Sequence, residues 1–205
     1  MLKLFYSPQS CALASHLALA EAGAAFEAVR VDFARQEQRQ PDYLRINPKG
    51  RVPALVTDRG ILTETPAILF YVAQTHPAAG LAPLDDPFEL GRIQAFNSYL
   101  CSTVHVAHAH RMRGYRWADD PATFADMARK VPGNVRDCFA LIEAEMFKGP
   151  WVMGGTFSIC DPYLYTLATW LEDDGVDPGQ FPRILDHRNR MSQRPNVARV
   201  LALHQ

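Results

Sequence analysis

Residues 47–55 read Asn-Pro-Lys-Gly-Arg-Val-Pro-Ala-Leu, and this stretch says more about the fold than any other part of the chain. A turn-forming cluster runs into Val52-Pro53 and then into a short apolar run. Because proline has no backbone N–H, Pro53 belongs at the first position or at the edge of a strand. The bond before a proline is also the one most able to be cis in a tight turn. A Val-Pro step held in that way would expose the backbone N–H and C=O of Val52 to an extended, peptide-like ligand.

Two further motifs flank this stretch. Residues 62–68 read Leu-Thr-Glu-Thr-Pro-Ala-Ile, so an acid and a hydroxyl stand directly before an apolar helix. Thr65 is a good N-cap residue and Pro66 suits the first helical turn. Residues 6–11 read Tyr-Ser-Pro-Gln-Ser-Cys and follow the opening strand. This last motif places a cysteine near the start of the first predicted helix.

In this order and spacing the three motifs resemble the glutathione S-transferase superfamily, and most closely its cysteine-bearing, bacterial beta-like branch. The resemblance covers nearly the whole chain, including the segment Phe-Ser-Ile-Cys-Asp at residues 157–161. It implies a glutathione-dependent transferase with a role in detoxification, in which glutathione is a co-substrate and no metal takes part. It also implies a homodimer formed through the long first helices of the second domain.

Composition limits the other possibilities. The 205 residues fit one large or two small domains, and the 48% of apolar residues suffice for a packed core. A formal net charge of −1 argues against a nucleic-acid-binding surface, which usually has a basic surplus. No apolar run approaches the roughly 18 residues of a membrane span, and the N-terminus lacks the apolar segment of a signal peptide. We therefore expect a cytoplasmic protein without nucleic-acid or membrane partners.

The cysteines support the same location. Cys11, Cys101, Cys138 and Cys160 are widely spaced, and neither a CxxC motif nor a paired-cysteine zinc pattern occurs. This distribution is typical of reduced thiols in a reducing compartment. We expect the last three to be core residues.

Strand and helix patterns divide the chain into two domains. Residues 1–76 alternate in the order β-α-β-(α)-β-β-α, which is that of a thioredoxin-like domain. Residues 77–87 are rich in Pro, Gly and Ala without any period, and we interpret them as a linker. Residues 88–205 show only helical patterns. The predicted fold is an α/β N-terminal thioredoxin-like domain plus an all-α C-terminal helical domain.

Three residues are candidates for contact with the glutathione sulfur. A helix N-terminus carries partial positive charge and favours a thiolate, whether of Cys11 or of a bound ligand. In the family that the motifs resemble, Ser or Tyr types donate a hydrogen bond to this sulfur, and Cys types can form a mixed disulfide with it. Tyr6, Ser10 and Cys11 supply all three possibilities, and Cys11 matches the beta-branch cysteine. The alternative is that Cys11 is a small side chain packed at the start of a helix.

The resemblance also assigns the remainder of a glutathione site. Glu64 would take the ammonium of the γ-glutamyl group, and Thr65, with the N–H groups of the helix, its carboxylate. The superfamily usually has Ser after this Glu, and Thr keeps the hydroxyl. The Val52-Pro53 backbone would pair with the cysteinyl part, and Arg51 could reach the glycyl carboxylate. The alternative is that the Glu-Thr-Pro motif merely begins a helix.

Residues 104–113 contain three histidines, which invite a metal interpretation. On a regular helix His105 and His108 share a face, whereas His110 points elsewhere, so three ligands cannot converge. We therefore expect no metal site. The resemblance implies instead that His105 faces the glutathione sulfur, although the family's following Lys is Val106 here.

The same helix would contribute to the second-substrate site. We expect His108, Arg111 and Tyr115 to shape a basic and aromatic pocket suited to an electrophile with an acidic group. The alternative is an exposed helix end without such a role.

Two other functions stay open. The first is glutathione-dependent thiol redox chemistry through Cys11, namely deglutathionylation, peroxide reduction or reductive dehalogenation. Because Cys-Ala-Leu-Ala at residues 11–14 lacks a second cysteine, any such route must use one thiol. The second is a non-catalytic interaction protein with a transferase-like fold. We expect Asp161 to be structural, as the acid of a capping box that starts a buried helix.

Overall fold

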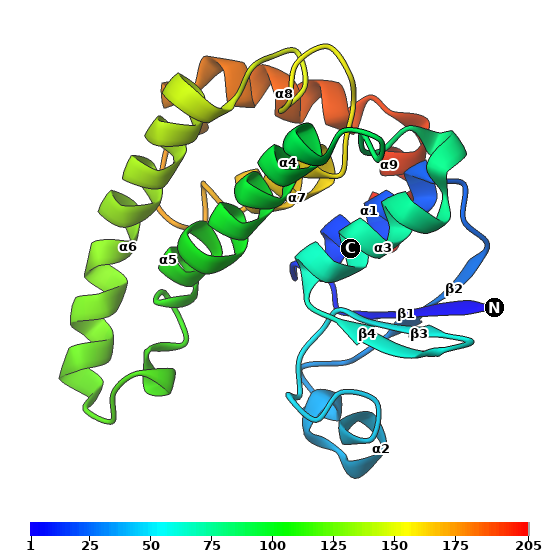
Figure 1. Cartoon of the computed structure of the whole chain (residues 1–205). Helices are drawn as coiled ribbons and strands as arrows, with labels where there is room; N and C mark the ends of the chain where they lie inside the picture. Colours follow the sequence, from blue (N-terminus) through cyan, green and yellow to red (C-terminus); the bar gives the residue numbers. More distant parts are fainter. Residues whose placement is uncertain (205) are drawn as a thin grey trace. The chain divides into compact units, whose positions relative to one another are not determined.

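The computed structural model describes residues 1–204, and contacts divide it into two compact units (Figure 1). The first unit contains Met1–Leu90 and the segment from Met191 onward, and the second contains Gly91–Arg190. The position of this last segment differs from the sequence prediction, which assigns residues 88–205 to the helical domain. It groups with the first unit because helix α9, Pro195–Leu201, packs against helix α1, Ala12–Glu21. The predicted boundaries at residues 76 and 88 stay a prediction.

The first unit is a four-stranded sheet with helices, as predicted. Strand β1 lies between β2 and β3 in the order β2-β1-β3-β4, parallel to β2 and antiparallel to β3. Helices α1 and α3 lie on one face of the sheet, and α2 lies beyond its other side (Figure 1). The elements besides α1 and α9 are β1 Leu2–Tyr6, β2 Phe26–Arg30, α2 Pro41–Leu44, β3 Ala54–Thr57, β4 Gly60–Thr63 and α3 Thr65–Thr75.

The Val-Pro step positions strand β3. The Val52-Pro53 peptide bond is cis, and β3 begins at the next residue. Pro53 thus needs no ladder hydrogen bond, as the sequence indicated. Leu55 on β3 and Leu4 on β1 are register partners with no exposed surface, so the strand that follows the motif is anchored in the core.

The second unit is helical. The predicted single helix over residues 88–112 is interrupted, since a π-helical stretch, Leu100–Val104, separates α4 from α5. Such stretches occur often at functional sites. Its α-helices are α4 Pro87–Tyr99, which begins in the first unit, α5 His105–Ala109, α6 Pro121–Leu141, α7 Cys160–Ala168 and α8 Pro182–Ser192.

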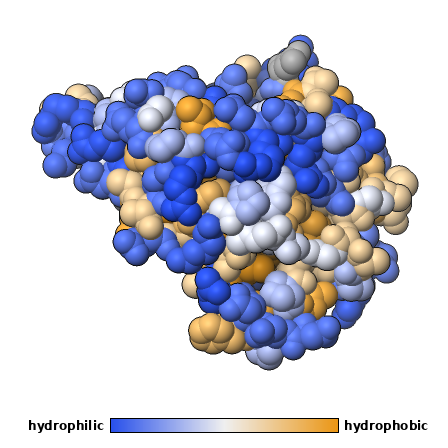
Figure 2. All heavy atoms as spheres, turned by 90° about the horizontal axis from the view of Figure 1, so that it is seen from above, coloured by the Kyte–Doolittle hydropathy of each residue, from blue (hydrophilic) through white to orange (hydrophobic). Residues whose placement is uncertain are grey.

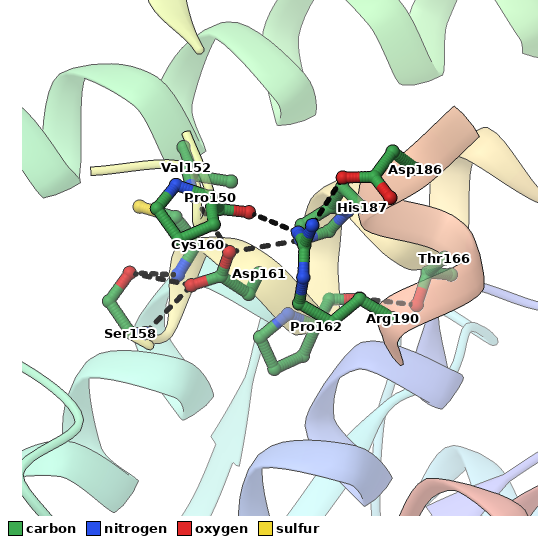
Figure 3. Close-up of polar contacts among 10 residues, drawn as sticks. All are labelled: Pro150, Val152, Ser158, Cys160, Asp161, Pro162, Thr166, Asp186, His187 and Arg190. Atoms are coloured by element: carbon green, nitrogen blue, oxygen red, sulfur yellow. Dashed lines mark hydrogen bonds and ion pairs between the residues drawn. The ribbon is translucent and has the colours of Figure 1, made fainter. Parts of the chain in front are cut away.

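Asp161 lies in the first turn of the buried helix α7, as expected of a structural residue (Figure 3). Its carboxylate has no exposed surface and accepts the backbone N–H of Ser158 at 2.7 Å and that of Val152 at 2.8 Å. It also lies 3.0 Å from Nε2 of His187 on α8, which is equally buried. One carboxylate therefore joins the start of α7, the preceding loop and α8.

Hydrophilic residues cover most of the face shown in Figure 2, and hydrophobic residues appear there as scattered patches. Among the large apolar side chains, Phe88 and Met112 are the most exposed after Met1, at 75% and 71%. Within residues 1–204, every helix is too short or too polar to serve as a membrane span.

A buried histidine pair attaches the C-terminal segment to α1. Nδ1 of His16 lies 3.0 Å from Nε2 of His204, and the Tyr6 ring packs against both imidazoles. Burial, followed by the proximity of His204 and then of Arg199, lowers the pKa of His16 to about 4. Burial also lowers the pKa of His204 to about 4. Both rings are thus neutral in the folded protein at neutral pH.

This pair is expected to make stability depend on pH. Below the ordinary histidine pKa of about 6.5, His16 and His204 are protonated in the unfolded chain, whereas in the folded chain they stay neutral down to about pH 4. The free energy of unfolding should therefore fall as pH falls from about 6.5 toward about 4. Urea unfolding at pH 7 and pH 5, compared with a His16→Gln/His204→Gln variant, measures this contribution. Equal pH dependence in both proteins would contradict it.

Candidate active site

Cys11 occupies the N-cap position of α1, at the positive end of the helix dipole. Its Sγ lies 3.6 Å from the carbonyl oxygen of Val52, a residue far away in sequence. The side chain is partly exposed. The fold thus brings the predicted cysteine beside the backbone predicted to bind the cysteinyl part of glutathione.

The other two candidates for the sulfur contact are engaged elsewhere. The Ser10 hydroxyl donates to the Ser7 carbonyl at 2.6 Å and accepts the Ala12 N–H at 3.3 Å, so it helps to start α1. The Tyr6 side chain is buried, and its hydroxyl donates to the Leu203 carbonyl at 3.2 Å. Both arrangements favour a structural role, and Cys11 is the candidate that the geometry supports.

The loop before Val52 is held by two buried side chains that the sequence analysis did not single out. The Tyr43 hydroxyl and the Asn47 amide both donate to the Arg51 carbonyl, each at 2.6 Å. Burial raises the pKa of Tyr43 to about 12, so this donor keeps its proton. Gly50, with φ of +59°, turns the chain where a side-chain Cβ would lie 2.9 Å from the Gln38 carbonyl. The conformation of the backbone before the Val-Pro step is therefore set by contacts within this chain.

Among residues 1–204, no protein acceptor is found for the Val52 N–H, and the Val52 carbonyl faces Cys11. These two groups are therefore open to an extended peptide, and their pairing with one stays a prediction. The Arg51 side chain is exposed, which leaves its guanidinium accessible to a ligand carboxylate.

Glu64 and Thr65 stand at the start of α3 in a different arrangement from the predicted one. Glu64, rather than Thr65, is the N-cap residue, and Thr65 is the first helical residue. Glu64 has φ of +72°, which is rare for a residue with a side chain and is often found at ligand sites. The Thr65 side chain is buried, and no hydrogen bond of its hydroxyl occurs within the described residues.

Lys49 adds a partner that the sequence analysis missed. Its ammonium group pairs with the Glu64 carboxylate and donates to the Thr63 hydroxyl at 2.7 Å. The Glu64 carboxylate is thus paired with an ammonium group of this chain. Glu64 is 55% exposed, so a ligand can reach it.

These groups fit a γ-glutamyl peptide. One carboxylate is placed for an ammonium, one helix N-terminus for a carboxylate, and one unpaired backbone N–H for a peptide carbonyl. A thiol lies beside the same backbone.

In the second unit, His105 and His108 lie on one side of α5, as helical spacing predicted. Their ring centroids are 6.3 Å apart, and the His108 ring stacks on Trp170 at 4.2 Å. His110 contacts Trp117 instead, at 4.3 Å. Within residues 1–204, no group of three or more metal-ligating side chains comes together. The predicted contact of His105 with the glutathione sulfur stays a prediction.

The surface around His108 and Arg111 also carries carboxylates, which the sequence pattern did not indicate. Asp174, a residue the sequence analysis did not consider, lies 2.8 Å from Nδ1 of His108 through each carboxylate oxygen. Arg111 lies 3.4 Å from Asp174 and 3.6 Å from Asp173. Both carboxylates lie near Arg111, so acidic groups accompany the basic ones on this surface, and the preference for an acidic electrophile stays a prediction. Tyr115 is 57% exposed.

Two of the remaining cysteines are packing residues, as expected. Cys138 and Cys160 are buried, and burial raises the pKa of both thiols. Cys101 is partly exposed, which differs from its expected place in the core. Because a raised pKa disfavours the reactive thiolate, Cys138 and Cys160 are unsuited to thiol chemistry.

A thioredoxin-like unit with a cysteine at the start of its first helix, together with a helical unit, defines a two-domain protein of the thioredoxin-like class. The family model described as "Glutathione S-transferase, N-terminal domain" matches residues 1–74, and "Glutathione S-transferase, C-terminal domain" matches residues 106–195. The chain belongs to the glutathione S-transferase family.

Individual relatives agree with this assignment. The chain is 31% identical to glutathione S-transferase GstA of Escherichia coli O157:H7, over 98% of each protein. A glutathione transferase homologue from Sulfitobacter with bound glutathione is 46% identical, with a TM-score of 0.96 over 99% of this chain and 98% of that one. The bacterial beta class enzyme of Sphingomonas chungbukensis is 35% identical, with a TM-score of 0.86 over 98% of each chain.

Proposed function

We propose that this chain is a glutathione transferase that holds the glutathione thiolate beside Cys11 for attack on an electrophilic small molecule. The observation that carries the proposal is the 3.6 Å contact between Sγ of Cys11 and the Val52 carbonyl. If the Val52 backbone pairs with the cysteinyl part of glutathione, the ligand sulfur lies next to Cys11 and the N-terminus of α1.

Each binding group would take one part of the tripeptide. Glu64 binds the γ-glutamyl ammonium, and Thr65 with the first turn of α3 binds its carboxylate. The Val52 N–H and C=O, which precede Pro53, pair with the cysteinyl unit, and Arg51 binds the glycyl carboxylate. These contacts are made to the two ends and the backbone of the tripeptide. They fix the position of the sulfur, although none of them is made to the sulfur itself.

Catalysis then follows from activation and proximity. The partial positive charge at the start of α1 favours the thiolate over the thiol. The thiolate forms a bond to the electrophilic carbon, and in a substitution the leaving group departs with its electron pair. Because the two reactants are held together, part of the entropic cost of the reaction is met on binding.

Two measurements test this function. Titration calorimetry with reduced glutathione should show one site per chain, and conjugation of 1-chloro-2,4-dinitrobenzene should exceed the uncatalysed rate at the same glutathione concentration. A protein that binds no glutathione would contradict the proposal and favour the non-catalytic interaction protein.

One observation also favours thiol redox chemistry as a second candidate. A cysteine sulfur, and not the engaged Ser10 hydroxyl, lies at the Val52 backbone. The Cys11 thiolate could attack a glutathionylated disulfide, form a mixed disulfide and release the other sulfur as a thiolate. Reduced glutathione would then release Cys11 and leave as glutathione disulfide. A glutathione-dependent reduction of bis(2-hydroxyethyl) disulfide that survives in a Cys11→Ala variant would exclude this route.

We further propose a cytoplasmic detoxification enzyme that acts as a homodimer. Reduced cysteines outside disulfide bonds fit a reducing compartment. The exposed Phe88 ring is a large apolar group of the kind that an interface covers. Light scattering should give twice the 23.0 kDa of one chain, and a mass of one chain would contradict the dimer.

A further inference from the structure

The side chain of Lys49 reaches from the turn before the Val-Pro step to the start of α3. Its ammonium group donates to the Thr63 hydroxyl at 2.7 Å and pairs with Oε1 of Glu64. The turn is held by the Asn47 side chain, which is 1% exposed and accepts the Lys49 backbone N–H at 3.2 Å. Thr63 is held by its register with Ala54 on β3. Both ends of this contact therefore start from backbone that the first unit holds in place.

Each partner of this ion pair keeps hydrogen-bonding capacity that the protein does not use. A lysine ammonium has three donors, and Thr63 and Glu64 take two of those of Lys49. A carboxylate has two acceptor oxygens, and within residues 1–204 Oε2 of Glu64 has no hydrogen bond or ion pair. The Lys49 side chain is 43% exposed and that of Glu64 is 55% exposed, so a ligand can reach both. The pair thus presents a positively charged donor beside a negatively charged acceptor.

An α-amino acid end group is complementary to such a pair. Its ammonium and its carboxylate are attached to the same carbon atom, so its two opposite charges also lie side by side. The ammonium would approach Oε2 of Glu64 while the carboxylate accepts a hydrogen bond from Lys49, and positive and negative groups would then alternate. A ligand with an ammonium alone would instead place a second positive charge near Lys49, and like charges close together repel.

The start of α3 gives an independent reason to expect a carboxylate next to Glu64. A helix N-terminus favours an anion, and the first turn of α3 contains no acidic side chain of its own. The Thr65 side chain is only 4% exposed, and among the described residues its hydroxyl has no hydrogen-bond partner. Lys49 and the start of α3 therefore favour the same kind of group at the same end of the site.

We propose that Lys49 is a specificity residue of the glutathione site, which selects a ligand with an α-amino acid end group by donating a hydrogen bond to its carboxylate. Glu64 binds the ammonium of the same end group through Oε2, while Oε1 keeps Lys49 in place. The inference rests on the proposed transferase function and deepens it. It assigns recognition of the γ-glutamyl end to two opposite charges, so that γ-glutamyl peptides are preferred to thiol peptides that end in a simple amine.

Glutathione and an analogue without the α-carboxylate test this role. 4-Aminobutanoyl-cysteinylglycine keeps the ammonium, the thiol and the glycyl carboxylate of glutathione. Titration calorimetry gives both dissociation constants, and the ratio of the analogue's constant to that of glutathione measures selection for the carboxylate. In a Lys49→Met variant glutathione should bind about fivefold more weakly, the upper value for an exposed ion pair, whereas the analogue should not. The ratio should therefore fall about fivefold.

Lys3→Met is the matched control. Lys3 lies on β1 of the same unit and forms an exposed pair with Glu27, in which both side chains are 45% exposed. This variant removes the same charge and should keep both dissociation constants, so it separates a local contact from the change in net charge. Because both lysines are exposed, neither replacement should prevent folding, and urea unfolding of the two variants checks this.

The outcomes separate this inference from the proposed function. A ratio in Lys49→Met equal to that of the wild type would overturn the inference. Tighter binding of glutathione by Lys49→Met would overturn it as well, since Lys49 would then compete with the ligand ammonium for Glu64. In both cases a wild type that binds glutathione would still support the transferase function. A wild type that binds neither ligand would contradict both proposals.

Discussion

Replacing Asp161 with alanine is expected to lower the free energy of unfolding by about 3–5 kcal/mol, as for other buried charges whose partner is removed. The carboxylate accepts the N–H groups of Val152 and Ser158, and it contacts Nε2 of His187. All of these groups are buried, so the variant leaves them without a partner and away from water. This loss is a large fraction of the 5–15 kcal/mol that stabilises a typical domain.

Urea unfolding followed by tryptophan fluorescence measures this effect. Asp186→Ala is a matched control from the same cluster (Figure 3), because Asp186 pairs with Arg190 but is 67% exposed. An exposed pair contributes about 0–1 kcal/mol, so the control should unfold nearly as the wild type does. Equal destabilisation by the two variants would show that Asp161 does not join α7 to its neighbours as described.

The second large effect is expected at Glu64. Glu64→Gln removes the charge that would bind the γ-glutamyl ammonium, and hydrogen bonds to charged groups contribute about 1.5–3 kcal/mol. The dissociation constant for glutathione should therefore rise about 10- to 100-fold. Stability should change little, because the Lys49–Glu64 pair is exposed.

Titration calorimetry with glutathione measures this change. Glu27→Gln is the matched control, since Glu27 forms a comparable exposed pair with Lys3, in which both side chains are 45% exposed. It should bind glutathione as the wild type does. If Glu64→Gln binds as tightly as Glu27→Gln, Glu64 does not hold the ammonium group.

Much of the first unit could be predicted from local sequence signals. The Pro53 and Pro66 positions and the turn-forming residues between the strands mark where each element starts or stops, and these signals act over a few residues. The capping box of Asp161 is equally local, and its predicted hydrogen bond to the Ser158 N–H is confirmed.

The interruption of the first long helix could not be predicted in the same way. The residues over 88–112 keep a helical period, yet a π-helical stretch occupies Leu100–Val104. A π-helix changes the hydrogen-bond register without any proline or glycine to signal it. Periodicity alone therefore overestimated the regularity of this helix.

The partners of the site residues were missed because they come from distant parts of the chain. Lys49 reaches Glu64, and Asp174 reaches His108, only after the units have folded. Sequence spacing identifies residues of the right chemical type but not the charges that neutralise them. The acidic partners of His108 and Arg111 were missed for this reason.

The proposed position of Cys11 beside the glutathione sulfur is tested most directly by native mass spectrometry after incubation with glutathione disulfide. Wild type should gain one glutathione in disulfide linkage, mapped to Cys11 by peptide analysis, and a Cys11→Ala variant should gain none. Calorimetry with reduced glutathione shows in parallel that both proteins keep the site. Absence of the adduct in a wild type that binds glutathione, or its persistence in Cys11→Ala, would contradict the placement of Cys11 at the sulfur.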